Sequence, residues 1–498
     1  MPTATAKQDV EALKSLLEEG LKTNQSNFLC YLFNKVALTP GRTLMPFRRE
    51  VMARLTDYFT SRNSLQLDEV DNFRLISGLR NISGAESEER AFLRSIVTLI
   101  SRHPVPPNQM VSLKDAVVSV YGLRQLRSAD SVVRTLLSTL EARIAHCEEG
   151  GRLDGQGVGM LLNGLQGLST DHEEVPALIK AVSRIIRVSE CGELNARSLS
   201  MLMFGLQNLR SDVPEVSELL VTITPLLRRC GGIVLTASQA SLCLTGLRRM
   251  SSAHTEVRDL VEALLPLLRR AEGTLSDKEA GLMMLGMRGL GGEEPVVRNL
   301  IPVVAHLLST CTDAPTGTGA AMLVAGLRCI SGESRQEKDL IIEVARLLAL
   351  CQRVDMRMFN ATMMMKGLHR LSSRQAETQE LVREVARLLS HCKETPTGDD
   401  VGSMLNGFHG MASEDDGVDA LASALAAIIE RATSNSGSRV SLDSVGLSLA
   451  VYGLQSCAVP EGGPGVLRLV RSVTSLLQIA KASGPTLDVR SAAQMVYG

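Results

Sequence analysis

The stretch Leu235–Ser252, LTASQASLCLTGLRRMSS, decides the fold, because variants of it recur along the whole chain. It has the pattern of one amphipathic helix that contains a glycine, Gly246. Counterparts of this glycine follow one another at intervals of 40 to 46 residues: Gly78, Gly122, Gly164, Gly205, Gly286, Gly326, Gly367, Gly407, Gly453 and Gly498. A period of this length is typical of a helical-repeat array.

Each repeat begins in the same way. Ten residues before the glycine stands a residue type that caps helix N-termini, because its side chain accepts hydrogen bonds from the free amides of the first turn. These predicted caps are Asp68, Ser112, Asp154, Asn195, Thr236, Ser276, Thr316, Thr397, Asp443 and Asp488. Only Arg357, ten residues before Gly367, departs from the rule.

The pattern predicts two helices in each repeat. The first runs over a segment such as Ala237–Met250 and buries positions that include Leu242 and Leu244. The second begins with acidic and ends with basic residues, as in Glu256 through Arg269, which suits the helix dipole. We therefore predict an all-α protein, a right-handed α-solenoid of about eleven two-helix repeats of 40–46 residues.

The two ends of the array are predicted to differ from its middle. Residues 1–61 are expected to form an N-terminal helix and a degenerate capping repeat, with Phe33 in the place of the glycine. Residues 62–498 are expected to form the tandem helical hairpins. Because the chain stops at Gly498, within a predicted helix, we expect the C-terminus to lie inside a repeat.

The recurring glycine needs a physical cause, since glycine within a helix costs about 1 kcal/mol relative to alanine. Close approach of a neighbouring helix backbone is the interpretation that we favour. A ligand cradle is the alternative, although phosphate-binding loops place their glycines before a helix rather than within it.

Composition limits the function classes only in part. The net charge is −1, so the chain is not a bulk polycation, yet it contains 42 Arg and only 11 Lys. Arginine offers a planar fork that suits nucleic acid, but a GC-rich coding sequence would produce the same bias.

Six of the 10 cysteines occupy one repeat position, at the end of the second helix: Cys147, Cys191, Cys230, Cys311, Cys351 and Cys392. Stacked helices lie roughly 8–10 Å apart, whereas zinc thiolates lie about 2.3 Å from the metal. We therefore expect buried free thiols in a reducing compartment, with no metal and no cofactor.

Two columns beside the glycine are the candidate binding residues. The residue two places after it, position +2, is always Arg, Gln or His: Arg80, Arg124, Gln166, Gln207, Arg248, Arg288, Arg328, His369, His409 and Gln455. The residue before it, position −1, varies and includes Tyr121, Asn163, Thr245, Lys366, Asn406 and Tyr452. Positions three apart share a helix face, and a polar column presented once per repeat is the layout of modular RNA readers.

Capping is the alternative interpretation of position +2, because Arg, Gln or His near a helix C-terminus can bind the last carbonyls. Catalytic motifs are absent: the sequence has no P-loop, no HExxH, no G-x-S-x-G and no CxxC pair. We therefore expect a protein that is not an enzyme and binds no small-molecule substrate.

The segments Leu275–Leu290, LSDKEAGLMMLGMRGL, and Leu487–Gly498, LDVRSAAQMVYG, resemble octotricopeptide-type repeats. These are related to the helical arrays that precede RAP domains in organellar proteins. The resemblance covers roughly residues 23–498. It implies an α-solenoid that binds single-stranded RNA in a mitochondrion or plastid, for RNA processing, stability, translation or ribosome assembly. HEAT and armadillo arrays share the period.

Two functional hypotheses follow. The first is RNA binding on a concave face lined by the first helices, and the second is a protein–protein interaction scaffold that uses the same face. No run reaches the length of a membrane span, so we expect no membrane contact. The N-terminal segment lacks a signal-peptide core or an Arg-rich transit pattern, so a cytoplasmic location stays open beside the organellar one.

Overall fold

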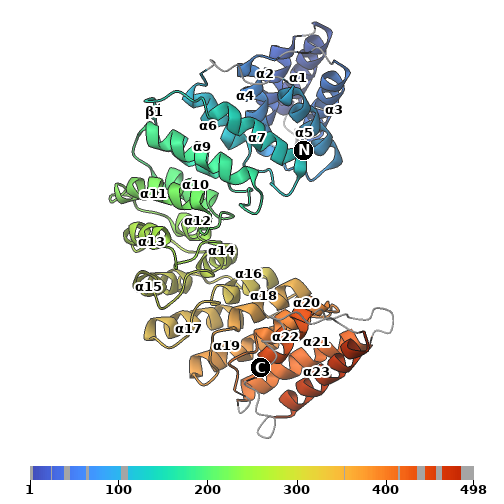
Figure 1. The fold of residues 1–498 in the computed structure, drawn as a ribbon, viewed down its shortest axis with the longest axis vertical. Coiled ribbons are helices and arrows are strands. Elements are labelled where there is room, and N and C mark those ends of the chain that lie inside the picture. Colours follow the sequence, from blue (N-terminus) through green and yellow to red (C-terminus); the bar gives the residue numbers. More distant parts are fainter. Residues whose placement is uncertain are drawn as a thin grey trace. The chain divides into compact units, whose positions relative to one another are not determined.

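The computed structural model describes residues 4–23, 25–38, 45–62, 65, 67–102, 110–352, 354–412, 415–434, 444–455 and 463–483. The chain divides into two compact units, Met1–Ile233 and Val234–Gly498. Almost all regular structure in both described units is α-helical, as predicted (Figure 1).

Unit 1 contains the following helices: α1 (Ala4–Thr23), α2 (Ser26–Leu38), α3 (Met45–Ser61), α4 (Glu69–Gly78), α5 (Ser87–Ser101), α6 (Leu113–Gly122), α7 (Ser131–Ile144), α8 (Gly155–Asn163), α9 (Glu174–Val188), α10 (Ala196–Gly205) and α11 (Pro214–Arg228). A short 3₁₀ helix, η2 (Leu79–Asn81), follows α4. Two short parallel strands, β1 (Arg152–Leu153) and β2 (Glu190–Cys191), join successive inter-repeat loops.

Unit 2 continues the pattern with α12 (Ala237–Thr245), α13 (Thr255–Leu268), α14 (Asp277–Met287), α15 (Pro295–Ser309), α16 (Gly317–Ala325), α17 (Arg335–Ala349), α18 (Met358–Leu368), α19 (Ala376–Leu389), α20 (Gly398–Asn406), α21 (Asp416–Ser434), α22 (Ser444–Gly453) and α23 (Pro464–Ser483).

The helices of each unit form two layers. In unit 1, the even-numbered helices from α2 to α10 pack in series, and so do the odd-numbered ones from α3 to α11. In unit 2, α12 to α22 and α13 to α23 pack in the same alternating way. We call the even-numbered helices A helices and their odd-numbered partners B helices. This serial packing of helix pairs confirms the α-solenoid, while its handedness stays a prediction.

The predicted N-caps are confirmed wherever the structure describes them. In α12, the hydroxyl of Thr236 accepts from the amide of Gln239 at 3.2 Å, and the Gln239 side chain accepts from the amide of Thr236 at 2.9 Å. The same position caps seven other A helices, through Asp68, Ser112, Asp154, Asn195, Ser276, Thr316 and Thr397. Arg357 makes no cap hydrogen bond, as its side chain predicts. Asp443, Asp488 and Gly498 lie outside the described residues.

The A helices are shorter than the sequence predicts. The expected helix Ala237–Met250 ends at Thr245, and Gly246 is its C-cap, with φ −58° and ψ −24°. Beyond this point the chain continues in tight turns, in which the amide of Leu247 donates to the carbonyl of Leu244 at 2.9 Å. The right-handed backbone of Gly246 shows that a left-handed cap is not the reason for glycine here.

Close backbone packing explains the glycine column, as predicted. A Cβ added to Gly286 would fall well inside 3.0 Å of the carbonyl oxygen of Leu244, on the preceding A helix. The same overlap, always with the carbonyl two residues before the previous glycine, recurs at Gly122, Gly164, Gly205, Gly326, Gly367, Gly407 and Gly453. Successive A helices from α4 to α10, and from α12 to α22, therefore touch main chain to main chain.

The first hairpin varies this arrangement. Phe33, in the place of a glycine, is fully buried in α2, and its ring fills the space next to Gly78 of α4. The ring also packs edge-on against Phe92 of α5, with 4.8 Å between the centroids. An aromatic side chain thus occupies the contact that glycine makes in the later repeats.

Arginines link successive B helices. Arg387 in α19 donates to the carbonyls of Cys351 and Leu348, at the C-terminus of α17, at 2.7 and 2.9 Å. Others donate to the preceding B helix in the same way: Arg143 to Ile100, Arg346 to Leu308 and Cys311, and Arg431 to Cys392. These bonds satisfy carbonyls that a helix end leaves without a partner, so capping uses part of the arginine excess.

The cysteine column lies where each B helix ends. Cys147, Cys230, Cys311, Cys351 and Cys392 are buried, as predicted, and Cys191 is half-buried. Burial raises the pKa of these thiols, for Cys351 to about 11. Among the described residues, no helix is long and apolar enough to cross a membrane.

Candidate nucleic-acid interface

Position +2 lies in the tight turn that follows each A helix. The amides of Arg248, Arg288 and Arg328 donate to the carbonyls at position −1 of their own repeats, at 3.1, 3.4 and 3.4 Å. Their side chains leave the turn at the edge of the A layer, where Arg248 and Arg328 are exposed and Arg288 is half-buried.

In unit 1, three of the +2 side chains bind the neighbouring repeat. Arg124 Nε donates to the carbonyl of Arg80 at 2.9 Å, and Gln166 Nε2 donates to the carbonyl of Arg124 at 2.6 Å. Gln207 Nε2 donates in turn to the carbonyl of Gln166 at 3.3 Å. The capping interpretation of position +2 therefore describes these three side chains.

Arg80 and Tyr121 belong to the same ladder. Burial lowers the pKa of Arg80, and the charge of Arg124 lowers it further, against an opposing effect of Tyr121. The Arg124 guanidinium also lies 5.0 Å from the centroid of the Tyr121 ring and donates to its hydroxyl. The Tyr121 side chain and the carbonyl of Arg80 are thus held by contacts within the repeat array.

In unit 2, the side chains of the +2 arginines do not bind the neighbouring repeat. Within the described part of the chain, the guanidinium groups of Arg248, Arg288 and Arg328 have no hydrogen-bond or ion-pair partner. Burial lowers the pKa of Arg288, and so, to a lesser extent, do the charges of Arg328 and Arg248. Three successive repeats therefore bring like charges together without a neutralising carboxylate.

Lys366, at position −1 of α18, faces the same group of charges. Burial lowers its pKa first, followed by the charges of Arg288 and Arg328, with opposing effects of Asp400 and Asp399. Its ammonium, too, has no ion pair with another described residue. We call Arg248, Arg288, Arg328 and Lys366 the cation strip.

The groups at the margin of the strip are paired. Arg370 Nη1 binds Glu293 Oε1 at 3.0 Å, and Cys329 Sγ donates to the carbonyl of Arg288 at 3.1 Å. Burial raises the pKa of the Cys329 thiol, so it is not a thiolate at neutral pH. The available charge of this region therefore belongs to the strip itself.

A ladder of rings continues the column towards the later repeats. The rings of His369 and His409 have centroids 5.7 Å apart, and the His409 ring stacks on Tyr452 at 4.6 Å with 2° between the planes. Burial and the imidazole of His369 lower the pKa of His409, against an opposing hydrogen bond from Gln455. His369 Nδ1 lies 3.1 Å from the carbonyl of Asn406. The structure thus brings these five predicted site residues together.

Two −1 residues are not where the sequence prediction placed them. Thr245 is fully buried and donates to the carbonyl of Ser241 at 2.7 Å, so the expectation that it is exposed is wrong. The reason is the close crossing of α14, whose Gly286 lies against Leu244 and Thr245. Asn163 is buried as well, and its Nδ2 donates to the Gln166 side chain at 3.3 Å.

Sequence reasoning missed another column. Leu242, four residues before Gly246, was expected in the core but is half-buried on the free face of α12. Half-buried apolar residues at this position −4 are Val118, Met160, Met201, Leu282, Met322, Met363 and Leu449. Positions −8, −4 and −1 fall on one helix face, and this spacing is the signal that could have revealed the column.

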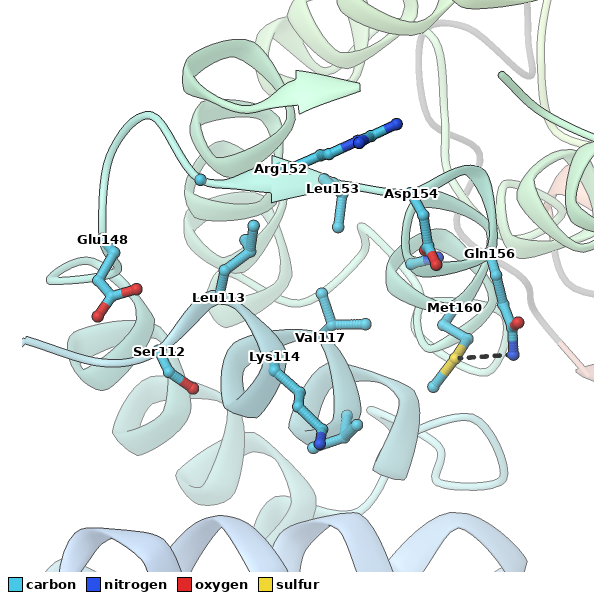
Figure 2. A pocket seen from close by; sticks show the side chains of 13 residues that line it. Ser112, Leu113, Lys114, Val117, Glu148, Arg152, Leu153, Asp154, Gln156 and Met160 are labelled. Carbon is cyan, nitrogen blue, oxygen red and sulfur yellow. Dashed lines mark hydrogen bonds between the residues drawn. The ribbon is translucent and has the colours of Figure 1, made fainter. Parts of the chain in front are cut away.

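A groove in unit 1 lies between two A helices. It measures about 750 Å³ and lies between the N-terminal ends of α6 and α8, beside β1. In Figure 2, Lys114 and Arg152 point in different directions. The lining also contains the carboxylates of Glu148 and Asp154, so the formal charges of these four side chains sum to zero. Asp154 caps α8. The polar groups of this groove therefore do not converge on a common point.

Metal chemistry has no visible basis in the part of the chain that the structure describes. No three His, Cys, Asp or Glu side chains there are grouped as metal ligands would be.

Comparisons with known proteins add little to this site. No protein-family model matches the sequence, and no curated protein matches it. A chain in a homology model of the full-length AP-3 complex in an intermediate open conformation aligns with 99% of this chain and 91% of its own, at 12% identity and a TM-score of 0.21. The crystal structure of SYS-1 aligns with 97% of this chain and 92% of its own, at 10% identity and a TM-score of 0.21. TM-scores this low do not define a shared fold.

Proposed function

We propose that this helical-repeat protein binds single-stranded RNA through the cation strip of unit 2, without catalysing a reaction. The observation that carries the proposal is the set of four cations, contributed by four successive repeats, that have no anionic partner among the described residues. A phosphodiester chain would neutralise such a row, and arginine binds phosphate with two parallel donors. The flat rings of His369, His409 and Tyr452 beside the strip would suit the bases.

The resemblance to octotricopeptide-type repeats supports the same class of ligand. It also favours a role in organellar RNA processing, stability, translation or ribosome assembly. The proposed interface differs from the one expected from sequence, since Arg124, Gln166 and Gln207 of unit 1 bind neighbouring repeats.

Replacing the three arginines tests the proposal. Fluorescence anisotropy with a labelled pool of random single-stranded RNA measures affinity at several salt concentrations. Each phosphate contact contributes about −0.7 to the slope of log K against log salt for single strands, so Arg248→Ala, Arg288→Ala and Arg328→Ala together should flatten the slope by about 2. We expect an affinity loss of at least about tenfold at low salt.

The matched control removes the same charge elsewhere. Arg228, Arg269 and Arg335 are exposed and lie on B helices or at their ends. Their combined replacement by alanine should leave both affinity and slope near the wild-type values. Equal effects of the two triple variants would contradict a specific role of the strip.

A protein partner is the second candidate, favoured by the net charge of −1 and by the half-buried apolar residues at position −4 of the A helices. Competition separates the two candidates. If poly-glutamate of matched length displaces RNA as well as unlabelled RNA does, the strip recognises acidic chains in general, and an acidic protein partner becomes the better assignment.

A further inference from the structure

Phe359 is the most exposed of the large apolar side chains in the described residues, at 71%. It lies at position −8, in the first turn of α18. The equivalent residues of the neighbouring A helices are polar: Ser238, Lys278, Thr318 and Asp399. Core packing therefore does not account for an aromatic ring here.

The ring shares a helix face with a member of the cation strip. Phe359, Met363 and Lys366 are spaced i, i+4 and i+7, which places them in one line along α18. The helix rises about 10 Å between the first and the last. Met363 and Lys366 are half-buried, so α18 presents a ring, a thioether and an ammonium in succession.

Positive charge is concentrated at one end of this line. Lys366 joins Arg288 and Arg328 at one end. At the other end, exposed charges of both signs occur: Lys278 and Asp399 stand at the positions of their A helices that correspond to Phe359, and Arg357 is the N-cap of α18. A polyanionic backbone is therefore attracted most strongly towards the Lys366 end.

We propose that Phe359 is a stacking platform for one base of the single-stranded RNA whose phosphates contact the cation strip. Every base has a π face, so an exposed aromatic ring binds without demanding one sequence. The charge pattern sets the direction of the nucleotide, with the phosphate at Lys366 and the base over Met363 and Phe359. This inference rests on the proposed function and adds to it the residue that contacts the base.

A single tryptophan tests the contact directly. The chain contains no Trp, so Phe359→Trp introduces one fluorophore at the proposed platform. We expect single-stranded RNA to quench its emission. The matched control is Val221→Trp, at a site 60% exposed on the B helix α11 of unit 1, whose emission should not change. Equal responses at both sites would overturn the proposal.

A ligand without bases separates stacking from charge attraction. Phe359→Ala should weaken binding of single-stranded RNA roughly 5- to 160-fold, since stacking on one aromatic residue has that effect. It should leave binding of an abasic phosphodiester oligomer of the same length unchanged. Phe359→Tyr should restore wild-type RNA affinity. Equal effects of Phe359→Ala on the two oligomers, or no effect on either, would show that Phe359 contacts no base.

The result distinguishes the two proposals. If Phe359→Ala acts on neither oligomer while the arginine triple variant weakens both, the strip binds RNA and the base lies elsewhere. If wild-type protein binds neither oligomer, the proposed function itself fails.

Discussion

The side chain of Arg124 is hydrogen-bonded to the main chain of Arg80 in the preceding repeat. Arg124 Nε donates to the Arg80 carbonyl at 2.9 Å, and Nη2 donates to Asn81 Oδ1 at 2.7 Å. One guanidinium thus makes two directed bonds across a repeat boundary, which a lysine ammonium cannot reproduce with the same geometry.

Arg124→Lys should therefore destabilise unit 1. Hydrogen bonds that involve a charged donor contribute about 1.5–3 kcal/mol, so we expect a loss of that order and a lower thermal midpoint by circular dichroism. Arg248→Lys is the matched control, because its guanidinium has no polar partner among the described residues. If both variants melt at the same temperature, the Arg124 bonds do not stabilise the array.

Gly286→Ala should destabilise unit 2 by more than about 1–3 kcal/mol, the usual cost of overpacking. The added methyl overlaps the carbonyl oxygen of Leu244, and backbone atoms cannot move aside as a flexible side chain can. Gly319→Ala provides the comparison, since its Cβ meets its nearest neighbour, Thr316 Oγ1, at an ordinary 3.4 Å. The second variant should be neutral or gain up to about 1 kcal/mol from helix propensity. Urea unfolding measures the stability of both variants. Equal free energies of unfolding for Gly286→Ala and Gly319→Ala would contradict the close-packing account.

Arg357→Ser should stabilise α18. Arg357 stands at the N-cap and makes no cap hydrogen bond, whereas a serine hydroxyl can accept an amide of the first turn. We expect a gain of about 1 kcal/mol in the free energy of unfolding. Arg357→Ala separates capping from loss of charge, because alanine removes the guanidinium without supplying an acceptor. A gain of equal size with alanine would assign the effect to charge.

The ring ladder predicts a pH dependence of stability. Burial and the charge of His369 lower the pKa of His409 below the ordinary value near 6.5. The unfolded chain then binds the proton more readily, so acid favours unfolding. The contribution of His409 is complete above about pH 6.5 and is lost as the pH falls through the folded-state pKa. The thermal midpoint of wild type should therefore fall more than that of His409→Gln between about pH 7.5 and 5.5. An equal fall in the thermal midpoint of wild type and His409→Gln would contradict this account.

The periodic features could be predicted because they recur in every repeat. The caps from Asp68 to Thr397 are simple local chemistry, since one side chain binds an amide three residues on. The glycine contact was also predictable, because the same costly residue recurs in phase with the repeat.

The candidate site was harder to predict, because exposure depends on how neighbouring repeats cross. Thr245 and Arg248 are three residues apart, yet the backbone of α14 covers Thr245, at the end of α12, while Arg248, in the turn beyond it, is exposed. Leu242 was assigned to the core from its apolar character, although the neighbours of α12 leave its position half-buried. At position +2, the side chains of Arg124, Gln166 and Gln207 bind neighbouring repeats, whereas those of Arg248, Arg288 and Arg328 do not, a difference that residue type alone does not encode.

The contact between Gly286 and the Leu244 carbonyl has an evolutionary consequence. Neither partner contributes a side chain to it, so this contact does not depend on the identity of the neighbouring surface residues. Substitutions on the free face of one repeat can accumulate without compensating changes in the next. Such a chain can acquire a new binding preference one module at a time while its framework stays the same.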